Sequence, residues 1–204
     1  MARTDAAVHR RGDAAIASPA SGLAGRGSAF GATAPQPGVS IPAGMPRLPR
    51  RESDVEAALW WLGVHGGAGE STLATFASGT RPAGHAWPVP AWPDRTQRVV
   101  LVARGNYSGL VAAQSASIEW AAGTLGDALR VEGLVIVADA PGLQPKVLRE
   151  FVQVVAGGVP RLWHIPWISA WRSGPVRAGD RLPSAFRQLF SDLSLSPRRG
   201  VASD

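Results

Sequence analysis

Residues 58–72 read ALWWLGVHGGAGEST, and they carry the strongest indication of fold in the sequence. The apolar run at 58–64 predicts a strand, and residues 70–77 predict a short helix directly after a glycine-rich turn. A strand, a glycine-rich turn and a helix in this order form the context that a phosphate-binding loop requires. Glycines in such a turn let successive backbone N–H groups converge on an anion. The sequence therefore indicates an anion-binding loop at the start of an α/β domain.

Apolar runs alternate with helical patterns through the rest of the chain. Further strands are predicted at 98–103, 133–138 and 161–165, and helices at 108–122, 145–156 and 183–190. The strand at 98–103, RVVLVA, does not alternate in polarity, which is typical of a strand that is buried on both faces. The segment 79–95 contains four prolines and is predicted to be a loop. We therefore predict a three-layer α/β fold with a short, mostly parallel sheet of about four or five strands.

Composition divides the chain into three parts. Residues 1–52 are rich in Ala, Gly, Pro and Arg, and we expect a disordered arm there. Ser53 and Glu56 have the spacing of a capping box, so we expect a short helix to start the folded domain, which extends over 53–175. Residues 176–204 are expected to form a short helix and a flexible tail.

The net charge of +6 lies mainly outside the predicted domain. Residues 1–51 contain seven Arg against two Asp, and residues 166–204 contain six Arg against three Asp, whereas residues 52–165 carry eight basic and ten acidic side chains. Nonspecific nucleic-acid binding is therefore expected only through the Arg-rich tails, if at all. Lys146 is the only lysine of the chain. Any mechanism that needs a lysine must use it.

Composition also excludes several classes of site. The chain has no cysteine, so disulfides and thiolate metal sites are impossible, and none of its four histidines form an i, i+4 pair. No apolar run approaches the roughly 20 residues that a membrane helix needs. The N-terminal stretch is a poor secretory signal. We expect a cytoplasmic protein that does not contact a membrane.

Residues 65–72, HGGAGEST, resemble the deviant Walker A loop of the ParA/MinD class of P-loop NTPases, whose pattern is K-G-G-x-G-K-[ST]-[ST]. The matching residues are Gly66, Gly67, Gly69, Ser71 and Thr72. His65 and Glu70 stand where that class carries its two lysines. The resemblance implies a site for Mg-ATP or Mg-GTP made of Gly66, Gly67, Ala68, Gly69, Glu70, Ser71, Thr72 and Asp139. In such a site Ser71 and Asp139 would hold the Mg²⁺ ion.

Two further segments carry the resemblance. Residues 135–142, VIVADAPG, resemble the strand and Asp-x-Pro segment of the same class, although an Asp that starts a turn explains Asp139 equally well. Residues 161–174, RLWHIPWISAWRSG, resemble the end of its last core strand. The tryptophans there and in the proline-rich loop either close a core or form a ring for a partner. Residues 55–175 also resemble a small uncharacterised family of high-GC bacteria and their mobile elements, which has the same GVHGGAGEST loop.

The loss of the lysine decides the expected function. Two unit charges about 4 Å apart repel by roughly 4 kcal/mol at an effective dielectric constant of 20. Glu70 is therefore either an internal anion of a loop that is retained for its shape, or part of a nucleotide-binding site with poor catalysis. An active enzyme is the least favoured of the three interpretations. His65, Ser71 and Asp139 also have the residue types of a hydrolytic triad, but nothing fixes their separation. A dinucleotide-binding loop is disfavoured because the spacing is not G-x-G-x-x-G.

We expect a pseudo-NTPase that acts as an interaction or regulatory module, with no catalytic residues and no obligatory cofactor. The partner would be another protein or a second copy of the chain in a homodimer. The alternatives are an atypical nucleotide-binding protein with weak or no hydrolysis and a DNA-partition accessory protein.

Overall fold

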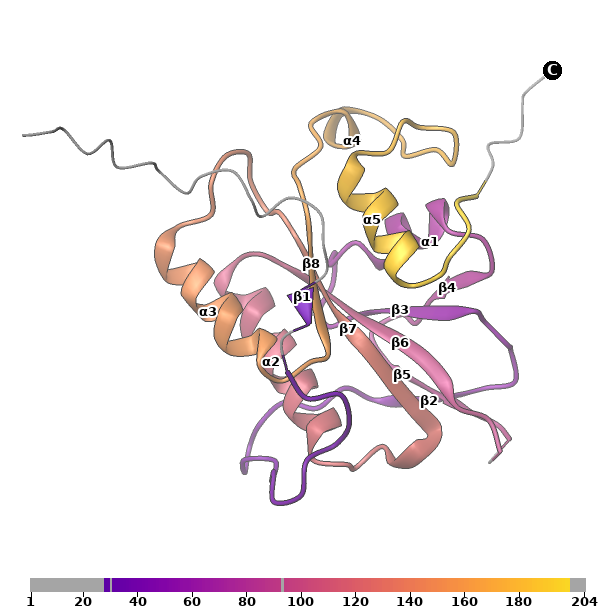
Figure 1. The fold of residues 1–204 in the computed structure, drawn as a ribbon, viewed down its shortest axis with the longest axis vertical. Helices are drawn as coiled ribbons and strands as arrows, with labels where there is room; N and C mark the ends of the chain where they lie inside the picture. Colours follow the sequence, from indigo (N-terminus) through magenta and orange to yellow (C-terminus); the bar gives the residue numbers. More distant parts are fainter. Residues whose placement is uncertain (1–27, 30, 93, 199–204) are drawn as a thin grey trace, which may run out of the picture.

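A mostly parallel β-sheet forms the middle layer of the molecule (Figure 1). The computed structural model describes residues 28–29, 31–92 and 94–198. Five parallel strands run in the order β8-β7-β6-β3-β4, and β1 is added antiparallel to β8 at the edge. Their bounds are β1 Ser28–Ala29, β3 Leu59–Gly63, β4 Thr80–Pro82, β6 Gln97–Arg104, β7 Leu129–Val137 and β8 Arg161–Ile165. The predicted α/β class and the parallel sheet are confirmed.

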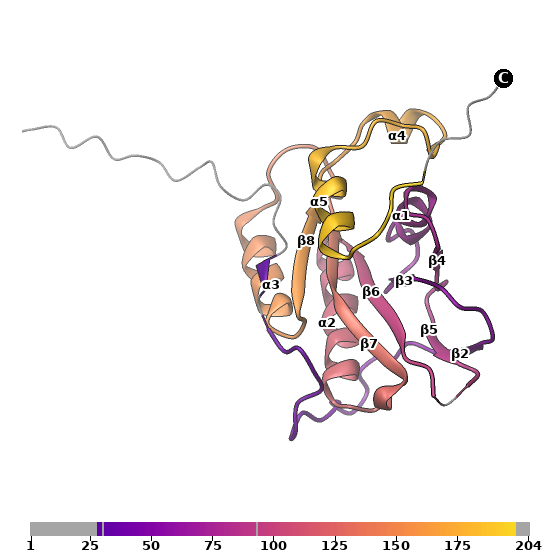
Figure 2. The same ribbon diagram turned by 45° about the vertical axis from the view of Figure 1, so that its right-hand side comes forward.

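Helices cover both faces of this sheet (Figure 2). They are α1 Glu70–Phe76, α2 Tyr107–Ala121, α3 Lys146–Ala156, α4 Ala170–Ser173 and α5 Ser184–Asp192, with a 3₁₀ turn, η1, at Gly126–Ala128. Helices α2 and α3 pack on one face, whereas α1 and α5 pack on the other. Numbered among themselves, the five parallel strands have the order 2-1-3-4-5. In such sheets the direction in which successive strands are added reverses between strands 1 and 3, here β3 and β6. Ligands bind at this point, outside the carboxyl ends of the strands.

Two hydrophobic cores result from the alternation of side chains along each strand. In β3, Trp60 and Leu62 belong to the core under α2 and α3, whereas Leu59 and Trp61 belong to the core under α1 and α5. The tryptophans divide between core and surface. Trp87 and Trp163 are buried, and 54% of Trp92 is exposed.

The segment at 79–95 differs from the predicted loop. It contains strand β4 and also β5, Trp87–Pro90, which pairs in parallel with β2, Arg50–Ser53, in a separate small sheet. Ser53 therefore ends a strand, and the helix expected to start there is absent: its hydroxyl accepts a hydrogen bond from Val55 N–H (3.2 Å) in a local turn. Strand β2 is polar and its partner β5 contains two prolines, so neither shows the apolar alternation from which a sheet is predicted.

The two ends of the chain also differ from the expected arm and tail. Residues 1–27 and 199–204 lie outside the described residues. Residues 31–53 pack on the domain instead of forming a disordered arm, since Leu48 N–H donates to Glu119 on α2 (3.2 Å) and Gln36 N–H donates to Ala121 O (2.8 Å). At the other end, Arg198 N–H donates to Phe76 O at the end of α1 (2.7 Å). Because α5 supplies the core residues Phe186, Leu189 and Phe190, the folded unit continues beyond residue 175.

None of the helices in the described part of the chain has the length and hydropathy needed to cross a membrane.

Candidate functional site

The glycine-rich loop lies at the carboxyl end of β3, beside the crossover point of the sheet. Its turn depends on glycine at two positions, because Gly67 has φ 72° and Gly69 has φ 112°, values that L side chains rarely adopt. Gly69 directly precedes α1, and Ala68 is fully buried beneath the loop. The predicted strand, loop and helix are therefore present in the expected order.

Glu70 turns its carboxylate inward instead of toward solvent. Only 7% of the residue is exposed. Its Oε2 accepts a hydrogen bond from Gly69 N–H at 3.2 Å. The carboxylate also fills the space beside Gly63, where a Cβ atom would lie only 2.5 Å from Oε2. The inward carboxylate of Glu70 thus occupies one backbone N–H of the loop.

His85 holds the other side of this carboxylate. Its Nε2 lies 3.4 Å from Glu70 Oε1, and its Nδ1 lies 2.8 Å from Gly63 O. Since a carbonyl oxygen only accepts hydrogen bonds, Nδ1 is the donor in the contact with Gly63 O. The backbone of His85 is in the left-handed region, with φ 58°. His85 lies in the proline-rich segment, and no sequence signal connected it with Glu70.

Arg104, at the end of β6, crosses the mouth of the loop. Its Nε donates to Gly67 O (2.9 Å), and its Nη1 donates to Ala138 O (3.2 Å) after β7. Burial and the charge of Arg172 on α4 lower the pKa of Arg104, while Asp139 and Glu70 act in the opposite direction. A guanidinium group does not lose its proton in proteins. Arg104 therefore places a permanent positive charge beside the loop, a role that the sequence did not reveal.

His65 fixes the loop to the same strand. Its Nε2 accepts a hydrogen bond from Arg104 N–H (3.0 Å), and its Nδ1 lies 2.9 Å from Gly66 O. Both contacts fit a neutral imidazole with its proton on Nδ1. Because both ring nitrogens are used by the backbone, His65 does not form a triad with Ser71 and Asp139.

Asp139 follows β7, as expected, but contacts the start of α2. Its Oδ2 accepts a hydrogen bond from Asn106 Nδ2 (3.1 Å), and Asn106 Oδ1 caps α2 by accepting from Gly109 N–H (2.8 Å). Ser71 is exposed, and its carbonyl accepts a hydrogen bond from the hydroxyl of Thr75. No hydrogen bond between described residues joins Asp139 to Ser71 or Thr72. Asp139 orders a helix start, and in the described ranges no three His, Asp or Glu side chains are grouped so as to hold a metal ion.

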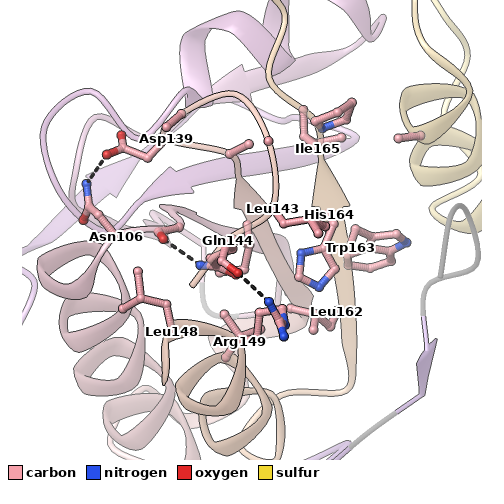
Figure 3. A pocket seen from close by; sticks show the side chains of 18 of the residues that line it. Asn106, Asp139, Leu143, Gln144, Leu148, Arg149, Leu162, Trp163, His164 and Ile165 are labelled. Atoms are coloured by element: carbon pink, nitrogen blue, oxygen red, sulfur yellow. Dashed lines mark hydrogen bonds between the residues drawn. The ribbon is translucent and has the colours of Figure 1, made fainter. Parts of the chain in front are cut away.

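A cavity of about 610 Å³ lies beside Asp139 and Asn106, which both line it, and extends from the carboxyl ends of β6 and β7 to β8 (Figure 3). It is lined by residues from β8, α3, α5 and the loop after β7, among them Leu143, which is 93% exposed. The His164 side chain lies against this cavity in Figure 3 and makes no hydrogen bond with a described residue. His164 is an exposed residue, and partial desolvation of its imidazole by the neighbouring protein lowers its pKa, which favours the neutral form. The sequence did not predict this cavity.

The described arginines before β3 make contacts within the fold. Arg47 Nε lies 3.4 Å from Glu119 Oε1, and Arg50 Nη2 donates to Thr124 O (2.6 Å). Both contacts fix the segment before β3 to the end of α2. Arg51 Nη1 donates to Ala83 O (3.4 Å), and the other four arginines of the N-terminal arm lie outside the described residues.

Comparison with known protein families identifies one match. The family described as "Family of unknown function (DUF6668)" matches residues 57–186, which is more than half of the chain. The chain therefore belongs to this family. Neither the curated proteins nor the solved structures give a match.

Proposed function

We propose that this DUF6668 protein is a pseudo-NTPase, an interaction or regulatory module whose glycine-rich loop is held in shape by its own glutamate. The inward carboxylate of Glu70 carries this proposal. It lies where the resemblance places the phosphate-contacting lysine, and it already accepts the N–H of Gly69. A bound phosphate would meet a buried negative charge and one fewer backbone donor.

The contacts of Arg104 support the same proposal. Its guanidinium group joins the carbonyl groups of Gly67 and Ala138 across the mouth of the loop. Carbonyl oxygens repel phosphate oxygens, and here they are already paired with the arginine. Part of the loop's hydrogen-bonding capacity, the Gly67 carbonyl and the Gly69 N–H, is thus already used within the chain.

The test is a calorimetric titration of the full chain with ATP and with GTP, each with and without Mg²⁺. We expect no binding by the natural protein and clear binding by Glu70→Lys, because the lysine removes the buried negative charge and supplies the missing cation. Glu70→Gln is the matched control, since it removes the charge and adds none. Micromolar Mg-nucleotide binding by the natural protein, with release of phosphate, would refute the pseudo-NTPase function.

A second candidate function is binding of a phosphate-bearing ligand without hydrolysis. It is favoured by the two arginines at this site: the charge of Arg172 acts on Arg104, and the Arg172 guanidinium lies 4.4 Å above the ring of Trp167. Together they supply positive charge that the lysine would otherwise provide. Nucleotide binding by the natural protein that is lost in Arg172→Ala, without any hydrolysis, distinguishes this function from the first.

A further inference from the structure

The cavity beside β8 is apolar over most of its lining. It extends from Gly105 and Asn106 after β6, past Asp139 after β7, to β8 and around the edge of that strand to α5. Its volume of about 610 Å³ is in the range of small-molecule sites, which are mainly apolar and contain a few polar groups that orient the ligand. Its apolar lining includes Ile136, Leu148, Val152, Leu162, Ile165 and Ala185. The polar groups beside these residues therefore indicate what the cavity can bind.

Strand β8 contributes one of these polar groups, the imidazole of His164. Leu162 belongs to the core under α2 and α3, whereas Trp163 and Ile165 belong to the core under α1 and α5. Because side chains alternate along a strand, His164 faces the same side of the sheet as Leu162. His164 is nevertheless exposed, and its ring makes no hydrogen bond with a described residue. A neutral imidazole can donate as well as accept, so this ring is available to a ligand in the cavity (Figure 3).

Arg149, in the first turn of α3, brings a positive charge to the cavity. Its Nη1 donates to Gln144 O (2.6 Å), and among the described residues it forms no ion pair with a carboxylate. The acidic residue of the described lining, Asp139, accepts a hydrogen bond from Asn106 (3.1 Å), and its charge acts on Arg104 beside the loop. Figure 3 shows Asp139 and Asn106 on one side of the cavity, away from Arg149. The side of the cavity at Arg149 is therefore positively charged.

We propose that this cavity binds a small molecule that has an apolar body and one carboxylate group, and that Arg149 and His164 receive the carboxylate. The Nε and Nη2 groups of Arg149 remain for the ligand, and two such donors match the two oxygens of a carboxylate. Asp139 repels a carboxylate from its own side, so the ligand takes one orientation. This site goes beyond the function proposed for the glycine-rich loop and does not rest on it.

The apolar body of the ligand has its own contact at the rim of the cavity. Leu143 lines the cavity and is 93% exposed. A ligand that covers this side chain removes apolar surface from water, which favours binding. Because Leu143 is exposed in the free protein, its substitution changes the ligand contact and leaves the core of the domain intact.

The test is a calorimetric titration of the full chain with octanoate, 1-octanol and octylamine. The three probes share one alkyl chain, and their head groups are negative, neutral and positive. We expect octanoate to bind about fivefold more tightly than octanol, the scale of one partly exposed ion pair, and octylamine to bind most weakly. The NMR signals of the His164 ring, identified by their loss in His164→Gln, should shift as octanoate is added. This shift shows that binding takes place in the cavity.

Substitutions test the two parts of the ligand separately. Arg149→Gln should weaken octanoate binding about fivefold and leave octanol binding unchanged. Lys146→Gln is the matched control, because it removes the same charge from the same helix at a residue that does not line the cavity. Leu143→Ser should weaken the binding of octanoate and octanol alike, by about fivefold. Its control is Val147→Ser, since Val147 is 68% exposed and does not line the cavity.

Equal affinities for octanoate and octylamine would overturn the proposal, because the cavity would then not recognise a carboxylate. Equal losses of octanoate binding in Arg149→Gln and Lys146→Gln would also overturn it, since a general attraction to positive charge does not distinguish the two residues. Unchanged His164 signals at millimolar octanoate would show that the cavity does not bind this class of ligand.

Discussion

Glu70 and Glu119 are both buried glutamates, but their carboxylates are satisfied in different ways. Glu119, on α2, is 1% exposed and accepts from Trp87 Nε1 (3.0 Å) and Leu48 N–H (3.2 Å), with Arg47 Nε at 3.4 Å. Glu70 accepts one backbone N–H and faces a histidine. Glu119 therefore has a full set of donors from two distant segments, whereas the donors of Glu70 are few and belong to its own loop and the segment after β4.

We infer from this difference that Glu119 stabilises the fold, whereas Glu70 affects what the glycine-rich loop can bind. Glu119 connects α2 to β5 and to the segment before β2, so its loss leaves donors in both of these segments without an acceptor. The bonds of Glu70 fix only the local conformation of the glycine-rich loop. We expect substitution of Glu119 to reduce stability most, and substitution of Glu70 mainly to change what the loop can bind.

The largest expected effect is that of Glu119→Ala. It leaves the buried N–H groups of Trp87 and Leu48 without an acceptor, and we expect the free energy of unfolding to fall by about 3 kcal/mol. Urea unfolding measures the change. The matched control is Glu150→Ala, because Glu150 is exposed on α3 and its ion pair with Lys146 (3.6 Å) contributes little. Equal losses for the two variants would contradict the structural role of Glu119.

A smaller effect is expected from Gly63→Ala. The added Cβ meets the Glu70 carboxylate at 2.5 Å, and we expect a loss of about 2 kcal/mol. The double variant Gly63→Ala/Glu70→Ala should recover most of this loss, because the three nearest atoms all belong to Glu70. Gly66→Ala is the control, since a Cβ there meets no heavy atom within 4 Å. Strictly additive losses in a thermal unfolding cycle would show that the two residues do not interact.

The smallest effect concerns a third carboxylate, Glu132, which accepts hydrogen bonds from two arginines: from Arg98 Nε at 2.7 Å and from Arg130 Nη2 at 2.6 Å. Burial by itself would raise the pKa of Glu132, but these hydrogen bonds and charges lower it below its ordinary 4.5. The stabilisation is therefore complete above pH 4.5 and is lost as the pH falls through the lowered pKa.

Glu132→Gln should accordingly cost about 1 kcal/mol at neutral pH and nothing at a pH well below that range. Urea unfolding at several pH values measures this difference. Glu56→Gln, at an exposed ion pair with Arg95, should change stability at neither pH. A difference between Glu132→Gln and the natural protein that stays constant down to acid pH would contradict the pairing.

The sequence predicts the central sheet because its strands are uninterrupted apolar runs separated by helical patterns. β3, β6, β7 and β8 lie where expected, although β7 begins at Leu129, before the predicted residue 133. Strands β2, β4 and β5 were missed, since they are short, polar or rich in proline. Their pairing depends on contacts between distant segments, which hydrophobic periodicity does not carry.

In the candidate site, too, features made of contiguous residues could be predicted and features made by distant segments could not. The glycine-rich loop could be predicted because its residues are contiguous. The direction of Glu70 could not, since it depends on space left by Gly63 and on His85 from the segment after β4. The cavity beside β8 is lined by residues from two helices, a strand and a loop, and no local sequence pattern predicts that these elements come together.

The prolines of β5 have a consequence for self-association. Trp87 and Ala91 donate their N–H groups toward β2, to Pro49 O and Ser53 O. By alternation, the N–H groups of residues 88 and 90 would face the other way, and both residues are prolines. The outer side of β5 thus has no donor in this stretch, so it cannot act as a template for strand-by-strand polymerisation. Two backbone donors that an added strand would need on this side are therefore removed by the covalent structure of the chain itself.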